Sequence, residues 1–177
     1  ANQFIWMENH ARDAKSGLLY HAWDESREQL WADKNTGVSP NFWGRAMGWY
    51  AMALVDVLDY FPKEHPKYQS LVLILQRLAS ATIKVQDGQT GLWYQVLDKP
   101  KEAGNYREAS ASCMFTYALL KGVRQGYLDN QYLEPAKKAY AGIIKEFVTQ
   151  DSDGSWHLEK VCMVAGLGGD PYRDGSF

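Results

Sequence analysis

The sequence is poor in cysteine, and its two cysteines indicate no metal centre. Cys113 and Cys162 lie far apart in the chain, and neither has a metal-ligating partner nearby. We expect both to be free thiols in the core. Two such cysteines leave the redox compartment undecided.

Long apolar runs and an excess of charge of one sign are also missing. The 177 residues carry a formal net charge of -2 without a stripe of Lys and Arg, so nothing favours a nucleic-acid partner. No apolar run approaches the ~20 residues that a membrane-spanning helix needs, so we expect no membrane partner. The start, from Ala1 to Phe4, lacks both the layout of a signal peptide and an initiator Met. Two explanations for the missing initiator Met therefore stay open, namely processing of the chain and a missing upstream part.

Aromatic residues, in contrast, are abundant. They make up 14% of the chain, with 7 Trp and 11 Tyr, within a composition that is 46% hydrophobic and 23% charged. Such a composition is typical of a globular protein, and the length suits one domain of roughly 100 to 200 residues. Many aromatic side chains suit a carbohydrate pocket, although they suit a large core equally well.

The stretch from Asn41 to Tyr50 concentrates unusual chemistry. If a helix starts near Trp43, then Arg45 and Trp49 are four residues apart and share one helical face. Indole rings cover the apolar face of a pyranose, and the planar guanidinium binds a carboxylate through two hydrogen bonds. The same residues also fit a packed core in which the arginine only stacks on aromatic rings. On composition alone both interpretations stay open.

Hydrophobic periodicity predicts an all-α chain with short strands in its loops. Residues 49–60 are apolar nearly all round, broken only by Asp56 and Asp59, which predicts a helix buried on several sides. Residues 66–85 and 133–149 are amphipathic, as outer helices are. The five expected helices are residues 4–12, 43–60, 66–85, 108–125 and 133–149.

An internal repeat links these helices. Residues 13–24 and 87–98 share Asp, two variable residues, Ser or Thr, Gly-Leu, one variable residue, Tyr, three variable residues and Asp. A weaker third copy is expected at residues 151–157, followed by a glycine-rich loop at 162–169. Buried helices that alternate with amphipathic ones indicate stacked hairpins in two rings, an α/α toroid whose loops collect at one end. A pocket is expected among those loops.

Three separated motifs resemble the unsaturated rhamnogalacturonyl hydrolases of glycoside hydrolase family 105, which are related to the unsaturated glucuronyl hydrolases of family 88. The motifs are Gly17–Asp24, Phe42–Trp49 and Pro171–Phe177. The resemblance runs over essentially the whole chain. It implies a six-hairpin (α/α)6 toroid that acts on pectin fragments ending in a 4,5-unsaturated galacturonic acid, usually linked to rhamnose. Such enzymes work in the cytoplasm or the periplasm, so the resemblance leaves the localisation open.

The resemblance also implies a reaction and a set of site residues. An Asp protonates the enol-ether double bond, water adds at C5, and the resulting hemiketal opens and expels the remaining sugar, without a metal or redox cofactor. His21, Trp43, Arg45 and Trp49 match the family's substrate-contacting positions. The family's catalytic Asp lies upstream of the first motif, in a segment with no counterpart here. No catalytic residue is therefore assigned to this chain.

Residues 1–177 accordingly resemble a single domain that forms the C-terminal part of the toroid. We expect about five of the family's twelve helices, with apolar surface left open on residues 49–60 and 109–120. A missing N-terminal half or self-association would cover that surface. We also expect the chain alone to bind, but not to hydrolyse, the unsaturated sugar.

Two other functions stay open from the sequence. The first is a polysaccharide lyase on a similar toroid, and the second is a noncatalytic sugar-binding toroid. Asp24 is the second choice for a catalytic acid. The equivalent residue in the second repeat is Asp98, and this equivalence favours a role for Asp24 in a turn. His157 is a candidate for the pocket lining, and Arg173 is expected either to reach a uronate or to pair with Asp174.

Overall fold

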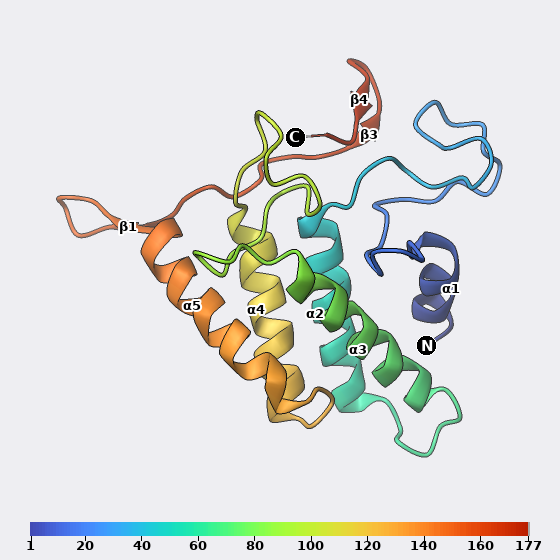
Figure 1. Ribbon diagram of the computed structural model, residues 1–177, viewed down its shortest axis with the longest axis horizontal. Helices are drawn as coiled ribbons and strands as arrows, with labels where there is room; N and C mark the ends of the chain where they lie inside the picture. The colour runs from blue at the N-terminus through green and yellow to red at the C-terminus, as the bar shows by residue number, and fades with distance from the viewer. Residues whose placement is uncertain (177) are drawn as a thin grey trace.

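A computed structural model describes residues 1–176, in which five α-helices form the body of the molecule (Figure 1). The helices are α1 (Asn2–Ala11), α2 (Gly44–Tyr60), α3 (Tyr68–Lys84), α4 (Ala109–Arg124) and α5 (Leu133–Phe147), with a 3-10 turn, η1 (Asn130–Tyr132), before α5. Each predicted helix is confirmed to within a few residues. Phe177, the last residue of the third motif, lies outside the described residues.

Short antiparallel strands lie in the loops, as predicted. Strands β1 (Val148–Gln150) and β2 (Trp156–Leu158) form one hairpin, and β3 (Leu167–Gly168) and β4 (Arg173–Asp174) form another. None of the helices in residues 1–176 has the length and apolarity needed to cross a membrane.

The helices are arranged as an inner and an outer layer. Helix α2 packs along α4, while α3 packs on α2, α5 on α4 and α1 on α3. The long loops 12–43, 85–108 and 148–176 gather at one end, and the short connections lie at the other end (Figure 1). The fold is thus part of an α/α toroid, with its loops where the repeat placed them.

Burial of the two inner helices agrees with the expected open apolar surface on α2 but not with the one expected on α4. Helix α2 buries Leu54 and Leu58, but its opposite face leaves Trp49 57% and Tyr60 89% exposed. It is therefore not covered on all sides. Helix α4 is buried along its first turns, including Phe115, because both α2 and α5 pack against it. The apolar surface expected on α4 is for the most part covered, and only Tyr117 is clearly exposed.

The repeated segments are turns held by an aspartate. The Asp13 carboxylate accepts hydrogen bonds from the backbone N–H and hydroxyl of Ser16, and Asp87 does the same for Thr90. A glycine with positive φ follows in both turns, because an L side chain is disfavoured in that conformation. Asp33 builds the same turn with Thr36 and Gly37, a copy that the sequence analysis missed.

The expected third copy at residues 151–157 is a different structure. These residues form the turn of the β1–β2 hairpin, in which Asp151 donates its N–H to the carbonyl of Ser155. The prediction was wrong because the segment shares only an aspartate, a glycine and an aromatic residue with the other copies.

A partly buried lysine joins the two inner helices. The ammonium group of Lys121 on α4 lies 2.7 Å from a carboxylate oxygen of Asp56 and 2.6 Å from one of Asp59, both on α2. Their arrangement explains why charged residues interrupt an otherwise apolar helix.

Candidate functional site

The four residues that the sequence analysis selected line one cavity. His21, Trp43, Arg45 and Trp49 surround a volume of about 300 Å³, which Met163, Val164 and Ala165 close from the C-terminal segment. The spacing explains the arrangement, because Trp43 is the residue before α2, and Arg45 and Trp49 follow one helical turn apart. His21 comes from the loop between α1 and α2. We call this space the Arg45 cavity.

Trp43 forms a rigid wall of the Arg45 cavity. Its side chain is only 3% exposed, and its indole N–H donates to the carbonyl oxygen of Gly175. The His21 ring lies against it, with 3.9 Å between the ring centroids and an angle of 41° between the planes. The start of α2 is fixed as well, because the Gly44 N–H donates to the Gln95 carbonyl over 2.8 Å.

Arg45 is oriented by a chain of buried contacts. Its guanidinium donates one hydrogen bond to the carbonyl oxygen of Cys162. The N–H of Cys162 in turn donates to the carboxylate of Glu108 over 2.8 Å. Glu108 is fully buried and caps α4, since its carboxylate also accepts from the N–H groups of Ser110 and Ala111. A guanidinium has five N–H donors, so an oriented Arg45 retains donors for a ligand.

Burial favours the neutral form of His21. Burial lowers the pKa of its imidazole, and no positive or negative neighbour is needed to explain the shift. Within residues 1–176, its buried Nδ1 atom has no hydrogen-bond partner. Trp49, Val164 and Met163 are the exposed side chains of the lining, so the cavity is open to solvent along them.

A second cavity of about 490 Å³ adjoins the Arg45 cavity at Trp43. It is lined by Gln95, Tyr106, Cys162 and Arg173, among other residues, and shares Trp43, Val164 and Ala165 with the Arg45 cavity. The buried Gln95 Oε1 accepts no hydrogen bond from any residue that the structure describes. Burial is the main reason that the pKa of Tyr106 is raised.

Sequence reasoning missed Gln95 and Tyr106. Tyr106 belongs to no recognisable motif, but Gln95 lies in the second repeat at the position equivalent to His21, which is a signal that could have identified it. Arg173, expected to pair with Asp174 or to reach a ligand, lines the second cavity and makes no ion pair within the described residues. The glycines of the loop at 162–169 give the backbone room for this arginine, because a Cβ on Gly166 would lie 2.8 Å from its Cζ.

Two weaker candidates have structural roles outside the cavity. The carboxylate of Asp24 accepts from the N–H groups of Gln29 and Ser26 and from the Ser26 hydroxyl, so it holds a turn, as the repeat predicted. Its pKa is lowered, first by the Gln29 N–H, which is unsuitable for an acid. His157 lies exposed on β2, 2.9 Å from Asp151, so its prediction as pocket lining was wrong.

No carboxyl group lines the Arg45 cavity in the part of the chain that the structure describes. Across residues 1–176 there is also no cluster of three or more histidine, cysteine, aspartate or glutamate side chains suited to a metal ion. What the arrangement can do chemically is to enclose an apolar ring face with indoles and to offer guanidinium N–H groups to an anion.

Comparison with known proteins gives the family. The sequence profile of Glycosyl Hydrolase Family 88 matches residues 1–176. Protein Atu3128 of Agrobacterium fabrum is 43% identical over 166 residues, which are 90% of this chain and 70% of that protein. The unsaturated rhamnogalacturonyl hydrolase YesR of Bacillus subtilis is 31% identical over 144 residues, 81% of this chain and 38% of that enzyme.

A solved structure agrees with these relatives. The family 105 glycoside hydrolase of C. acetobutylicum is 54% identical and superposes with a TM-score of 0.95, covering 99% of this chain and 49% of that chain. The chain therefore spans about half of this relative's length. From the profile match and the shared toroid, the chain belongs to Glycosyl Hydrolase Family 88 and closely resembles its family 105 relatives.

Proposed function

We propose that this chain supplies the substrate-binding half of a hydrolase that acts on unsaturated uronyl oligosaccharides. The observation that carries the proposal is the convergence of His21, Trp43, Arg45 and Trp49 on one cavity of about 300 Å³. The name of the Bacillus subtilis relative supports an unsaturated galacturonyl residue linked to rhamnose, as in pectin fragments.

Each residue has a part in the proposed binding of the uronate. Arg45, held by the Cys162 carbonyl, binds the carboxylate through its remaining N–H groups. Trp43 and Trp49 cover the apolar faces of the ring. His21, kept neutral by burial, donates one hydrogen bond to a sugar oxygen and adds no charge beside Arg45.

The reaction needs a proton donor, and we place it outside the described residues. A carboxylic acid protonates the enol-ether double bond, water adds at C5, and the hemiketal opens with loss of the remaining sugar. No lining residue of the Arg45 cavity carries a carboxyl group. We therefore propose that the chain alone binds this substrate without hydrolysing it.

The exposed face of α2 is where we propose that further helical hairpins complete the ring. Trp49 and Tyr60 lie on it, and the aromatic area exposed there is unusual for a finished surface. Residues 1–177 are, in this proposal, one part of a single (α/α)6 domain. Sedimentation analysis with intact-mass measurement tests it, because a lone 20.1 kDa monomer with this face open would contradict it.

The decisive assay follows the ultraviolet absorbance of the unsaturated uronate. A hydrolase removes this absorbance from an unsaturated rhamnogalacturonan disaccharide, whereas a polysaccharide lyase creates it from intact polymer. A noncatalytic sugar-binding protein does neither, although the sugar still quenches its tryptophan fluorescence. Intact mass is measured on the same sample. Loss of absorbance in a sample that contains only the 177-residue chain would refute our placement of the proton donor.

Substitution of Arg45 tests its role in binding. In the complete enzyme, Arg45→Ala is expected to raise KM more than it lowers kcat, because the carboxylate is bound alike in the ground and transition states. An unchanged KM would assign Arg45 to structure alone.

A further inference from the structure

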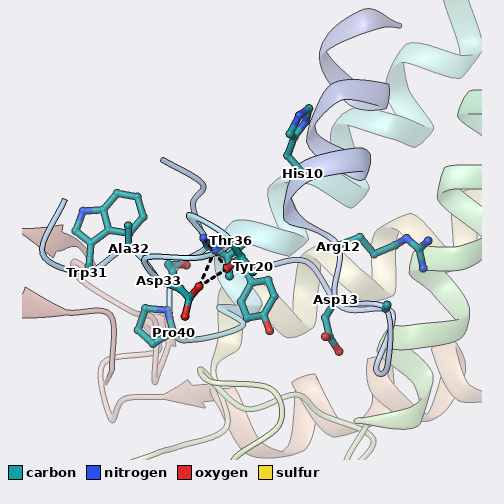
Figure 2. Close-up of a pocket in the computed structure, with 12 residues that line it drawn as sticks. His10, Arg12, Asp13, Tyr20, Trp31, Ala32, Asp33, Thr36 and Pro40 are labelled. Carbon is teal, nitrogen blue, oxygen red and sulfur yellow. Dashed lines mark hydrogen bonds between the residues drawn. The ribbon is translucent and has the colours of Figure 1, made fainter. Parts of the chain in front are cut away.

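A larger cavity lies apart from the residues that carry the proposed function. It has a volume of about 660 Å³ and lies between the end of α1 and the loop that leads to α2. Figure 2 shows that its walls come from opposite sides, with Trp31, Asp33 and Pro40 facing His10 and Asp13. We call this space the Trp31 cavity. It shares no lining residue with the Arg45 cavity.

The charge of the Trp31 cavity is negative. Asp13 and Asp33 each use one carboxylate oxygen to hold a turn, through Ser16 and Thr36 respectively. Within residues 1–176, the second oxygen of each aspartate accepts no hydrogen bond. The one cation in the lining, Arg12, is engaged by the carboxylate of Glu8, with 3.1 Å between the paired atoms. Two carboxylate oxygens are therefore available as acceptors, and the two aspartates outnumber the one arginine in the lining.

Tyr20 adds a hydroxyl group that the fold does not use. In the described part of the chain its phenol makes no hydrogen bond, while its ring is fixed against Phe42, with 4.5 Å between the centroids. Burial, followed by the charges of Asp13, Asp98 and Asp33, raises the pKa of this phenol, so the hydroxyl keeps its proton. A protonated phenol both donates and accepts hydrogen bonds.

Trp31 supplies an apolar plane at the edge of this polar cavity. Its side chain is partly exposed, and its indole N–H donates no hydrogen bond to the residues that the structure describes. The hairpin of β3 and β4 supports the ring, since a Cβ on Gly168 would lie 3.9 Å from Trp31 Cδ1. An indole face beside free acceptors and a hydroxyl is an arrangement suited to a pyranose.

We propose that the Trp31 cavity is a second carbohydrate site and that it selects a neutral sugar. The hydroxyl groups of a neutral pyranose donate to Asp13 and Asp33 and exchange hydrogen bonds with Tyr20, while its apolar face stacks on Trp31. A uronate is disfavoured here because its carboxylate meets two like charges. The two cavities therefore divide the sugars by charge, with uronates at Arg45 and neutral sugars at Trp31.

Indole resonances give a site-resolved test. In protein labelled with ¹⁵N, each of the 7 Trp side chains gives one N–H signal, and Trp31→Phe identifies the signal of interest. The probes are L-rhamnose, D-galactose and D-galacturonate. We expect at least one neutral sugar to shift the Trp31 signal in a saturable way. Galacturonate should bind there at least about fivefold more weakly, since a like charge 4 Å away costs roughly 1 kcal/mol even in water.

A variant tests the contact without disturbing the ring. Tyr20→Phe removes only the hydroxyl group and should weaken the neutral sugar about threefold to tenfold, the range for one neutral hydrogen bond. Trp156→Phe, in the exposed β1–β2 hairpin, is the matched control and should leave the affinity unchanged. The proposal is overturned if neither neutral sugar shifts the Trp31 signal, if galacturonate binds there equally well, or if Tyr20→Phe retains full affinity in a spectrum that is otherwise native. Binding at the Arg45 cavity is followed through the Trp43 and Trp49 signals, so failure here leaves the proposed function untouched.

Discussion

Glu108 is the residue on which the position of Arg45 depends, and we predict that Glu108→Gln both destabilises the fold and loosens the site. The carboxylate accepts from the N–H groups of Ser110, Ala111 and Cys162, over 3.0, 2.6 and 2.8 Å. An amide retains one acceptor oxygen and turns an NH2 group toward a donor. In a fully buried position, at least one backbone N–H then loses its partner.

The magnitude follows from these contacts. A hydrogen bond to a charged group contributes about 1.5 to 3 kcal/mol, and an unsatisfied buried donor costs about 1 to 3 kcal/mol. We expect a loss of about 2 to 4 kcal/mol in the free energy of unfolding, a large share of the roughly 5 to 15 kcal/mol typical of a domain. Urea unfolding followed by circular dichroism measures it.

The matched control is Glu134→Gln in the first turn of α5. It makes the same chemical change where the side chain is 79% exposed, and we expect an effect of at most about 0.5 kcal/mol. Hydrogen exchange provides the second readout, because residues 160–166 should exchange faster in Glu108→Gln and not in the control. Wild-type stability in Glu108→Gln, or lost stability with unchanged exchange in 160–166, would refute the reasoning.

Three further predictions concern stability. Burial lowers the pKa of His21 in the folded chain, so the unfolded chain takes up a proton at higher pH than the folded chain does. The free energy of unfolding therefore falls as the pH drops below about 6.5. His21→Gln should flatten this dependence in urea titrations between pH 7 and 5. Gly48→Ala places a Cβ 2.9 Å from that of Met114 and should cost about 1 to 3 kcal/mol in urea unfolding, whereas Gly88→Ala, in open space, should be nearly neutral. Lys121→Met removes the hydrogen bonds that lower the pKa values of Asp56 and Asp59 on α2. The loss of thermal stability that we expect below about pH 4 should therefore be shallower in the variant than in the wild type. An unchanged dependence of thermal stability on pH would contradict this.

The helices and the Arg45 cavity were predictable because they depend on local spacing. Arg45 and Trp49 share a face by helical periodicity alone, and the repeat placed His21 in a loop at the same end of the fold. The contacts that orient Arg45 were not predictable. Cys162 lies 117 residues away in the chain, and Glu108 acts on Arg45 only through its hydrogen bond with Cys162. Nothing in local sequence indicates such a pairing.

Two errors have equally physical causes. The turn at Asp33 escaped notice because it keeps the aspartate, threonine and glycine of the repeat but not the following leucine and tyrosine. The second error concerns α4, on which open apolar surface was expected, because the packing of α5 against α4 does not follow from the periodicity of α4 itself.

The most direct test of the central claim is a calorimetric titration of the 177-residue chain, which in our proposal binds the substrate without hydrolysing it. The ligands are the unsaturated galacturonyl-rhamnose disaccharide and its methyl ester, each titrated into wild type and Arg45→Met. If Arg45 binds the carboxylate, the wild type prefers the acid by about tenfold or more, as expected for a hydrogen bond between charged groups, and the variant binds both ligands alike. Equal affinity of the wild type for acid and ester, or a preference for the acid that survives in Arg45→Met, would contradict the account.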